Sequence, residues 1–305
     1  MSTKRLLFMG SKNAGLIALR RLLAQLPEGC IQGVLCPDDR LDQRTEYPSF
    51  QLLAQENNLN FHLVQNNKET AELIGLYQPH TVLVHGWYRI IPLEMFPDID
   101  FFGFHYSHLP QYRGFAPIVW QIINGERRLG VSFFAFGEGI DDGELVDQRF
   151  FELAAHEDIA DAIGKANHLV ASMLDEFLPQ WLAGKVNVYP QAKGPVSYCG
   201  RRAPEDGRID WRTAAESVHN FIRAQARPYP GAFSLLPSGR VVRFWKSEIE
   251  PRQFYGVPGA VVDFTPDAII VACRTGAVRV LLAEIERDAT EESACTLRSL
   301  NVRFT

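Results

Sequence analysis

Short apolar runs alternate with longer amphipathic stretches through the first half of the chain. The run at 6–9 is typical of a buried strand, and after a glycine turn leucine and isoleucine recur from 14 to 26 at the spacing of a helix face. We expect buried strands at 6–9, 31–36, 61–64 and 81–85, and helices at 14–26, 49–57 and 69–77. This alternation predicts an α/β fold, a Rossmann-like parallel sheet covered on both faces, with ligands at the carboxyl edge of its strands.

The pattern changes in the second half. A strand at 145–151 is followed by a helix at 157–183 with one apolar face, and the segment 187–195, which contains prolines and a glycine, is typical of a linker. Beyond it, one helix at 213–223 interrupts short β-type runs. These runs lie at 241–245, 260–264, 268–273 and 278–283. Closely spaced strands predict a small OB-like β-barrel, so we expect two domains, 1–190 and 195–305.

Composition narrows the class of partner. The 305 residues carry a formal net charge of -5, with 22% charged and 46% hydrophobic residues, as in ordinary globular proteins. The longest basic groupings are the pairs Arg127-Arg128 and Arg201-Arg202. This distribution argues against a nucleic-acid surface, although a local phosphate site remains compatible with it.

Cysteine usage and hydropathy limit the compartments in which the protein can work and the cofactors that it can hold. Five cysteines without a Cys-x-x-Cys pair indicate neither a disulfide framework nor a zinc site. No stretch approaches the roughly 20 apolar residues that cross a bilayer, and the run at 6–9 is too short for a signal-peptide core. Gly10 to Gly15 lacks the glycine spacing of a dinucleotide site. We therefore expect a cytoplasmic protein without metal, NAD or a membrane partner.

One stretch, 103–144, combines the groups that an acyl-transfer site needs. His105 can shuttle a proton near neutral pH, and Asp141, in a glycine-rich turn, can hold an imidazole in one tautomer. Together they can manage the charge that develops when an acyl group is attacked. Each residue alone is typical of ordinary structure, so the hypothesis depends on the combination.

The chain resembles the folate-dependent formyltransferases over essentially its whole length. The resemblance rests on His105, the Leu-Pro-x-x-Arg-Gly turn ending at Gly114, Pro117 and the Gly-x-Asp-x-Gly turn at 139–143. The second half, through GRRAPEDGRIDW and RAQARPYPGAF, is similar to the C-terminal domain that accompanies the methionyl-tRNA enzyme and the 4-amino-4-deoxy-L-arabinose enzyme. The segment GWYRIIP is more similar to the sugar enzymes.

The resemblance implies 10-formyltetrahydrofolate as cofactor, tetrahydrofolate as its product, and an amine as acceptor. Asp141 would orient His105 and accept the amine proton, while His105 would stabilise the oxyanion and protonate the departing nitrogen. The folate slot is carried over to Gly86, Trp87, Tyr88, Ile90, Ile91, Gly139, Ile140 and Asp141. The acceptor side is carried over to Tyr106, Ser107, Arg113, Gly114, Phe115 and Pro117.

Gly103 departs from the family pattern. The family has an asparagine two residues before the histidine, where it donates to the formyl oxygen, and losing one such donor typically costs on the order of 100- to 1000-fold in rate. Ser107, His108 or a backbone amide could supply the donor, or the transfer could be slower or differently arranged, or the chain could be a binding relic. Retention of the histidine, the arginine and the aspartate favours an active enzyme.

The predicted acceptor is a UDP- or dTDP-linked 4-amino-4-deoxy sugar, as in polysaccharide biosynthesis. An enzyme for methionyl-tRNA would need basic loops, whereas this chain is acidic and its linker has only Lys185 and Lys193 nearby. The alternatives are a catalytically silent folate or nucleotide-sugar binding protein and a formyltransferase for another amine or for methionyl-tRNA. A homodimer formed through the C-terminal half is compatible with each of them.

Overall fold

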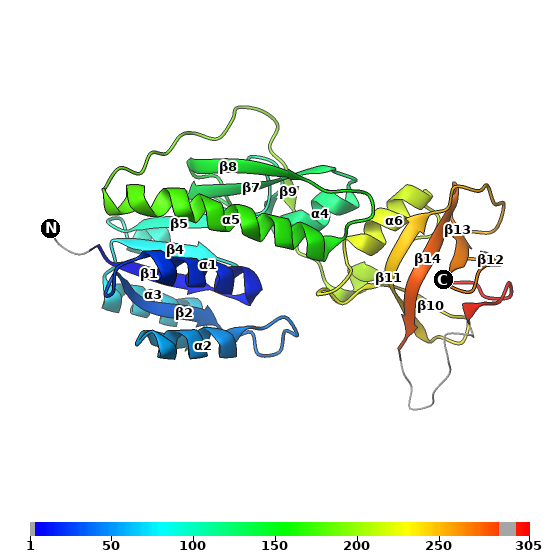
Figure 1. Ribbon diagram of the computed structural model, residues 1–305, viewed down its shortest axis with the longest axis horizontal. Coiled ribbons are helices and arrows are strands. Elements are labelled where there is room, and N and C mark those ends of the chain that lie inside the picture. Colours follow the sequence, from blue (N-terminus) through cyan, green and yellow to red (C-terminus); the bar gives the residue numbers. More distant parts are fainter. Residues whose placement is uncertain (1–3, 287–296) are drawn as a thin grey trace. The chain divides into compact units, whose positions relative to one another are not determined.

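The computed structural model describes residues 4–286 and 297–305, which divide into two compact units (Figure 1). The first unit comprises Met1–Pro117, Leu129–Phe151 and Ile163–Gly200. The second comprises Ile118–Arg128, Glu152–Ala162 and Arg201–Thr305. The second unit therefore takes two short segments from the first two hundred residues.

A seven-stranded sheet with the order β3-β2-β1-β4-β5-β7-β8 is the centre of the first unit. Its strands are β1 (Leu6–Gly10), β2 (Ile31–Pro37), β3 (Asn60–Val64), β4 (Thr81–His85), β5 (Asp100–His105), β7 (Arg128–Ala135) and β8 (Leu145–Glu152). All pairs among β1 to β5 are parallel, which confirms the predicted sheet for these strands.

The prediction of a wholly parallel sheet is wrong at one side. β7 pairs with β5 in the antiparallel direction. Between them the chain forms only the two-residue strand β6 (Arg113–Gly114), which pairs with β9 (Tyr198–Cys199), and the short helix α4 (Pro117–Ile123). A parallel crossover needs a dozen or more residues that bring the chain back to the opposite end of the sheet, whereas this segment leaves the chain at the end where β5 stopped.

Four long helices cover the sheet and confirm the predicted ones, with ends displaced by a few residues. They are α1 (Lys12–Gln25), α2 (Tyr47–Glu56), α3 (Asn67–Tyr77) and α5 (Ile159–Leu182), and a 3-10 turn lies at Leu93–Met95. Val82 and Val84 of β4 pack in one core cluster with Ile74 of α3. On the other face, Thr81 accepts a 2.8 Å hydrogen bond from the indole of Trp181 in α5. Successive residues of a strand point to opposite faces, so both faces are buried.

The second unit contains a five-stranded antiparallel sheet with the order β10-β11-β14-β13-β12. Its elements are β10 (Ala232–Leu235), β11 (Val241–Ile249), β12 (Val261–Phe264), β13 (Ile269–Ala272), β14 (Ala277–Ile285), the helix α6 (Ala215–Arg223) and a 3-10 turn at Pro204–Gly207. The predicted strands and helix are confirmed, and β10 is an additional strand. Val218 and Ile222 of α6 share a core cluster with Val242 and Phe244 of β11.

The cysteines that the structure describes are buried and free: Cys30, Cys36, Cys199 and Cys273. Burial raises the pKa of the Cys36 thiol to about 12. Cys295 lies outside the described residues.

Within the ranges 4–286 and 297–305, no helix is long and apolar enough to cross a membrane, and no three histidine, cysteine or carboxylate side chains gather as metal ligands.

The aromatic contact of α5 with the sheet should dominate the stability of the first unit. Phe177 is 3% exposed and packs edge-on against Phe102 and Phe133, with ring centroids 5.3 and 4.8 Å apart. Truncation of a buried phenylalanine leaves a cavity, so Phe177→Ala should lower the free energy of unfolding by about 3 to 5 kcal/mol in urea titrations. Leu182→Ala, at an exposed position of the same helix, is the control. Equal losses in both variants would contradict this packing.

Candidate active site

Strand pairing places His105 at the carboxyl edge of the sheet. His105 ends β5 and lies opposite Ser132 of the antiparallel strand β7. After β7, the backbone N–H of Phe136 still bonds to β5, at the carbonyl oxygen of Phe101. The glycine-rich turn at 137–143 then folds back and brings Asp141 to the imidazole. The two residues predicted to act together are therefore brought together by one strand pair and one turn.

The bonds of His105 define its protonation. Nδ1 lies 3.4 Å from Asp141 Oδ2, and Nε2 lies 2.7 Å from the carbonyl oxygen of Tyr112. A carbonyl oxygen only accepts hydrogen bonds, so Nε2 carries a proton, and Nδ1 can donate to Asp141 only in the imidazolium form. The ring is 8% exposed, which limits competition by water. The pair can thus hold a proton between an imidazole and a carboxylate.

Backbone and amide donors hold Asp141. The Gly114 N–H donates to Asp141 Oδ2 at 2.7 Å. Gln191 Nε2 donates to the carbonyl oxygens of Asp141 and Gly143 at 2.8 and 2.9 Å. Asp141 has a φ of 48°, in the left-handed region that residues other than glycine rarely adopt. Such backbone persists where neighbouring bonds over-determine it, as they do here.

Close contacts require glycines in this turn. A Cβ at Gly143 would overlap a carbonyl oxygen of β7, and a Cβ at Gly137 would overlap the carboxylate of Asp142. That carboxylate accepts a 3.0 Å hydrogen bond from the Gly139 N–H. Asp142 therefore closes the turn, which leaves its neighbour in the sequence to face the histidine.

Arg113 also helps to hold the turn that carries Asp141. Its Nη2 donates to Gln191 Oε1 at 2.6 Å, and its Nη1 reaches the Tyr198 hydroxyl at 3.5 Å. Its Nε is buried and has no hydrogen-bond partner within the described residues. Arg113 thus orients the amide of Gln191, which in turn holds the turn of Asp141. The contact with an acceptor that was predicted for Arg113 stays a prediction.

Other residues predicted for the acceptor side or as oxyanion donors have partners of their own. Ser107 is fully buried, and its hydroxyl donates to the Gln111 carbonyl at 2.6 Å. His108 stacks on Phe150 with ring centroids 4.4 Å apart. A hydroxyl has one proton, so Ser107 cannot donate to a ligand while it keeps this bond. Phe115 is 45% exposed beside the end of β6. The oxyanion-donor role predicted for Ser107 or His108 stays a prediction.

A second histidine, His85, supports Tyr106. His85 Nε2 lies 3.1 Å from the Tyr106 hydroxyl, which donates to the Asn167 side chain of α5. Because that hydroxyl proton goes to Asn167, His85 donates through Nε2. Its Nδ1 is buried without a partner among residues 4–286 and 297–305. Burial lowers the pKa of His85 to about 3 and keeps the ring neutral.

The loop after β4 begins at a glycine that contacts the first turn of the fold. Gly86 has a φ of 76°, and a Cβ there would lie 2.5 Å from the Ser11 carbonyl oxygen. The Ser11 hydroxyl donates to the Gly86 carbonyl at 2.6 Å. Trp87 packs against the core cluster on the α3 face, and its indole nitrogen is buried without a partner in the described part of the chain.

The remaining residues of the predicted folate slot differ in exposure. Tyr88 and Ile90 are 45% and 82% exposed, whereas Ile91 is buried. In the turn before Asp141, Ile140 is 60% exposed. Exposed apolar side chains thus occur in both segments that the slot was expected to use, as a binding surface for a flat ring requires.

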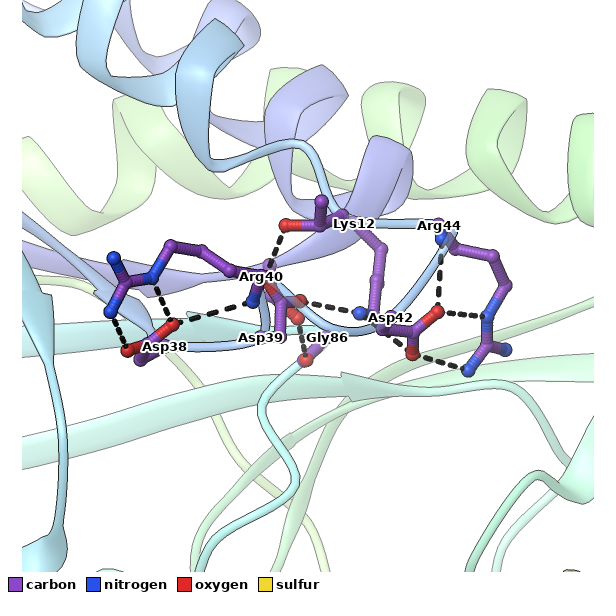
Figure 2. Close-up of polar contacts among 9 residues, drawn as sticks. Lys12, Asp38, Asp39, Arg40, Asp42, Arg44 and Gly86 are labelled. Atoms are coloured by element: carbon purple, nitrogen blue, oxygen red, sulfur yellow. Dashed lines mark hydrogen bonds and ion pairs between the residues drawn. The ribbon is translucent and has the colours of Figure 1, made fainter.

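Charged side chains from the segments after β1 and β2 gather near Gly86, which follows β4 (Figure 2), and sequence reasoning did not anticipate this cluster. Lys12, with a φ of 61° directly after β1, forms ion pairs with Asp39 and Asp42. Asp42 also pairs with Arg44 at 2.8 Å. The sheet order reverses between β1 and β4, and open α/β sheets bind ligands at such a reversal. The sequence signal for this cluster is the high density of aspartate and arginine from 38 to 44.

Gln191 was also missed. It lies in the segment 187–195, which sequence reasoning assigned to a linker. Its partners in the glycine turn are 48 and 50 residues away, so no local pattern indicates the contact. Tyr112, whose carbonyl oxygen fixes the tautomer of His105, contributes only backbone and is equally invisible to sequence reasoning.

The buried His85 predicts a pH dependence of stability. With a folded pKa of about 3 and an unfolded value near 6.5, the unfolded chain binds a proton that the folded chain rejects, so stability falls as pH drops below about 6.5. From pH 7.5 to 5.5 this group should remove about 1.4 kcal/mol from the free energy of unfolding. His85→Gln should remove this part of the loss in urea titrations at both pH values. The exposed His156→Gln should retain it, and an unchanged loss in His85→Gln would refute the assignment.

Comparison with known proteins identifies the family of this chain. Residues 28–176 match the formyl transferase family, and residues 202–300 match the C-terminal domain of formyl transferases. The chain is 30% identical over 221 residues to the bifunctional polymyxin resistance protein ArnA of Wigglesworthia glossinidia brevipalpis, a match that covers 72% of this chain and 33% of that protein. The chain therefore spans about a third of the length of this relative.

Solved structures share the fold at low sequence identity. The N-formyltransferase from Helicobacter canadensis, in complex with folinic acid and dTDP-3-aminofucose, is 19% identical with a TM-score of 0.71, over 92% of this chain and 100% of that one. HypX from Aquifex aeolicus, in complex with tetrahydrofolic acid, is 21% identical with a TM-score of 0.65, over 94% and 45%. Matches to both the N-terminal and the C-terminal family descriptions, in the expected order, show that this chain belongs to the formyl transferase family.

Proposed function

We propose that this protein transfers a formyl group from 10-formyltetrahydrofolate to the amine of a nucleotide-linked amino sugar. The observation that carries the proposal is the buried pair of His105 and Asp141, with Nδ1 and Oδ2 3.4 Å apart. Family membership supports the reaction class. The Helicobacter canadensis structure, which contains folinic acid and dTDP-3-aminofucose, supports the two ligands.

The residues around the site fit a donor with a flat ring. The backbone at Gly86 approaches Ser11 too closely for a side chain, and Trp87 keeps a buried N–H that has no partner in the described residues. Tyr88 and Ile90 present apolar surface to solvent. Such a slot needs apolar walls and a few polar groups at its edge. 10-Formyltetrahydrofolate supplies the formyl group and leaves as tetrahydrofolate.

The protons that His105 and Asp141 can give and take match the proton transfers that the reaction needs. An amine attacks only through its free lone pair, so its proton must pass to a base, and Asp141 is a carboxylate fixed in direction by the Gly114 N–H. In the imidazolium form, His105 keeps its Nε2 proton on the Tyr112 carbonyl. The proton on Nδ1 is then the one that faces the reacting atoms. It stabilises negative charge on the formyl oxygen and afterwards moves to the departing nitrogen.

The charge of the chain supports a small acceptor. A protein that holds a tRNA needs many lysines and arginines against phosphates, whereas this chain has a net charge of -5. At the reversal of the sheet, Lys12 is already paired with two aspartates. Tyr106, Arg113 and Phe115 are the side chains that we assign to the acceptor side.

One observation favours a second function. Gly103 cannot donate the hydrogen bond that the family's asparagine provides, so a catalytically silent protein that binds folate or a nucleotide sugar is the competing proposal. Incubation with 10-formyltetrahydrofolate and a panel of UDP- and dTDP-linked amino sugars, followed by mass spectrometry, separates the two. A mass gain of one formyl group supports transfer. Binding of the folate without any formylated amine, aminoacyl-tRNA included, supports the silent protein.

We further propose that residues 1–190 act as the catalytic domain and residues 195–305 as an OB-like domain. The match of 202–300 to the C-terminal family description supports the second assignment, as does the five-stranded antiparallel sheet. Tyr112 and Gly114, which bond to His105 and Asp141, lie within 1–190, and Gln191, which holds the Asp141 turn, follows this boundary directly. The chemistry is therefore assigned to the first domain.

Removal of either member of the pair should abolish transfer without unfolding the protein. His105→Gln loses the proton that stabilises the oxyanion, and Asp141→Asn loses the base, so kcat should fall by about 100-fold or more in either variant. Formyl transfer to the accepted amino sugar is measured by mass spectrometry, and circular dichroism checks the fold. His156→Gln, at an exposed position, is the control. Near-normal turnover in either site variant would overturn the assignment.

Gln191 should act as a positioning residue. Gln191→Leu removes the two hydrogen bonds that hold the backbone of the Asp141 turn, and each is worth about 1 kcal/mol, so kcat should fall roughly tenfold or more. Because Gln191 Oε1 also accepts from Arg113 on the assigned acceptor side, the KM for the amino sugar should rise as well. Gln180→Leu, at an exposed position of α5, provides the comparison. If kcat were unchanged in Gln191→Leu, the amide would have no part in positioning the base.

A further inference from the structure

Gly103 is buried in β5, two residues before His105. A Cβ built on it would lie 2.5 Å from Cε1 and 3.0 Å from Cζ of Phe136, and 3.1 Å from the Val84 carbonyl oxygen. Real Cβ atoms do not approach other atoms as closely as 2.5 Å. The phenyl ring thus occupies the space in which any side chain at position 103 would begin.

Phe136 is firmly held in this position. Its backbone N–H donates to the Phe101 carbonyl at 2.9 Å. Its ring stacks on Phe134 at 5.1 Å between centroids and on Phe101 at 6.5 Å. It also packs against two core clusters, one on the α3 face and one around Leu109. The ring cannot move aside without giving up these contacts.

Residues two apart on a strand project to the same face, so positions 103 and 105 face the same side of the sheet. The ring that meets Gly103 is therefore next to the side of β5 that carries the imidazole. A phenyl ring offers no hydrogen-bond donor to an oxygen, but it excludes water and lowers the local dielectric. Charge on His105 and Asp141 acts more strongly in such surroundings.

We propose that Phe136 lines the formyl subsite in place of the side chain missing at position 103. Gly103 and Phe136 form one packed unit, an apolar wall, and the formyl oxygen is held by His105 against this wall rather than by an amide donor. This inference rests on the proposed function, because it assigns the lining of that site. It also accounts for the glycine: a polar residue at 103 and a phenylalanine at 136 exclude each other sterically.

A double-mutant cycle of unfolding measurements tests the packing of Phe136 against Gly103 without any substrate. Gly103→Ala should lower the urea midpoint of unfolding, and Phe136→Leu should lower it through lost ring contacts. In the double variant the two shifts should be clearly less than additive, because the shorter side chain makes room for the Cβ. Phe50→Leu, a fully buried ring that stacks on Phe8 of β1, is the control and should combine additively with Gly103→Ala. Additive shifts for the Phe136 pair would overturn the proposal.

Measurements of turnover test the chemical half of the proposal, namely that the apolar wall stands in place of an amide donor. Gly103→Asn alone should be poorly folded, whereas Gly103→Asn combined with Phe136→Leu should fold and gain an amide donor, with kcat raised on the order of 100-fold and folate affinity kept. In this background His105→Gln should lower kcat by a smaller factor than in the parent chain, because the amide then also holds the formyl oxygen. A folded double variant that binds folate with parental kcat would refute the wall. If neither the parent nor the variants transfer formyl to any amine, the chemical half and the proposed function both fail, while the urea midpoints still decide the packing.

Discussion

The antiparallel pairing of β7 with β5 is the constraint on which the site depends. It fixes His105 opposite Ser132 and directs the chain that leaves β7 along the same face of the sheet. Because β7 runs back from the level of His105 to that of Phe102, the turn at 137–143 has only a short way to return before Asp141 reaches the imidazole. The single reversal in an otherwise parallel arrangement thus makes a histidine and an aspartate thirty-six residues apart neighbours, with 3.4 Å between Nδ1 and Oδ2.

Fixed backbone groups then give the imidazole and the carboxylate defined orientations. The Tyr112 carbonyl accepts a hydrogen bond from Nε2, and the Gly114 N–H holds the Asp141 carboxylate towards Nδ1. Gln191 and Arg113 hold the strained turn from outside. None of these partners needs to change when a proton moves between imidazole and carboxylate. Preorganisation of this kind is what makes electrostatic stabilisation effective in a site that excludes water.

Sequence reasoning identified what local periodicity and short motifs encode. The strands and helices of the first half follow from apolar spacing, and His105 and Asp141 from a histidine and a glycine turn. It failed where the determinant lies far away in the chain. The direction of β7 depends on pairing rather than on its own pattern, and Gln191 looks like an ordinary linker residue. The pairing order of the second sheet, by itself, leaves the predicted barrel closure a proposal.

The absence of an amide beside His105 is better understood as a packing solution than as a simple loss. Deleting the side chain at position 103 alone would leave a cavity in a dense region between Phe101 and Phe134, and cavities of this kind cost stability in proportion to their volume. The ring of Phe136 fills that volume, so the two positions are stable only together. Restoring the asparagine alone is then opposed by the aromatic ring, and replacing the ring alone is opposed by the cavity.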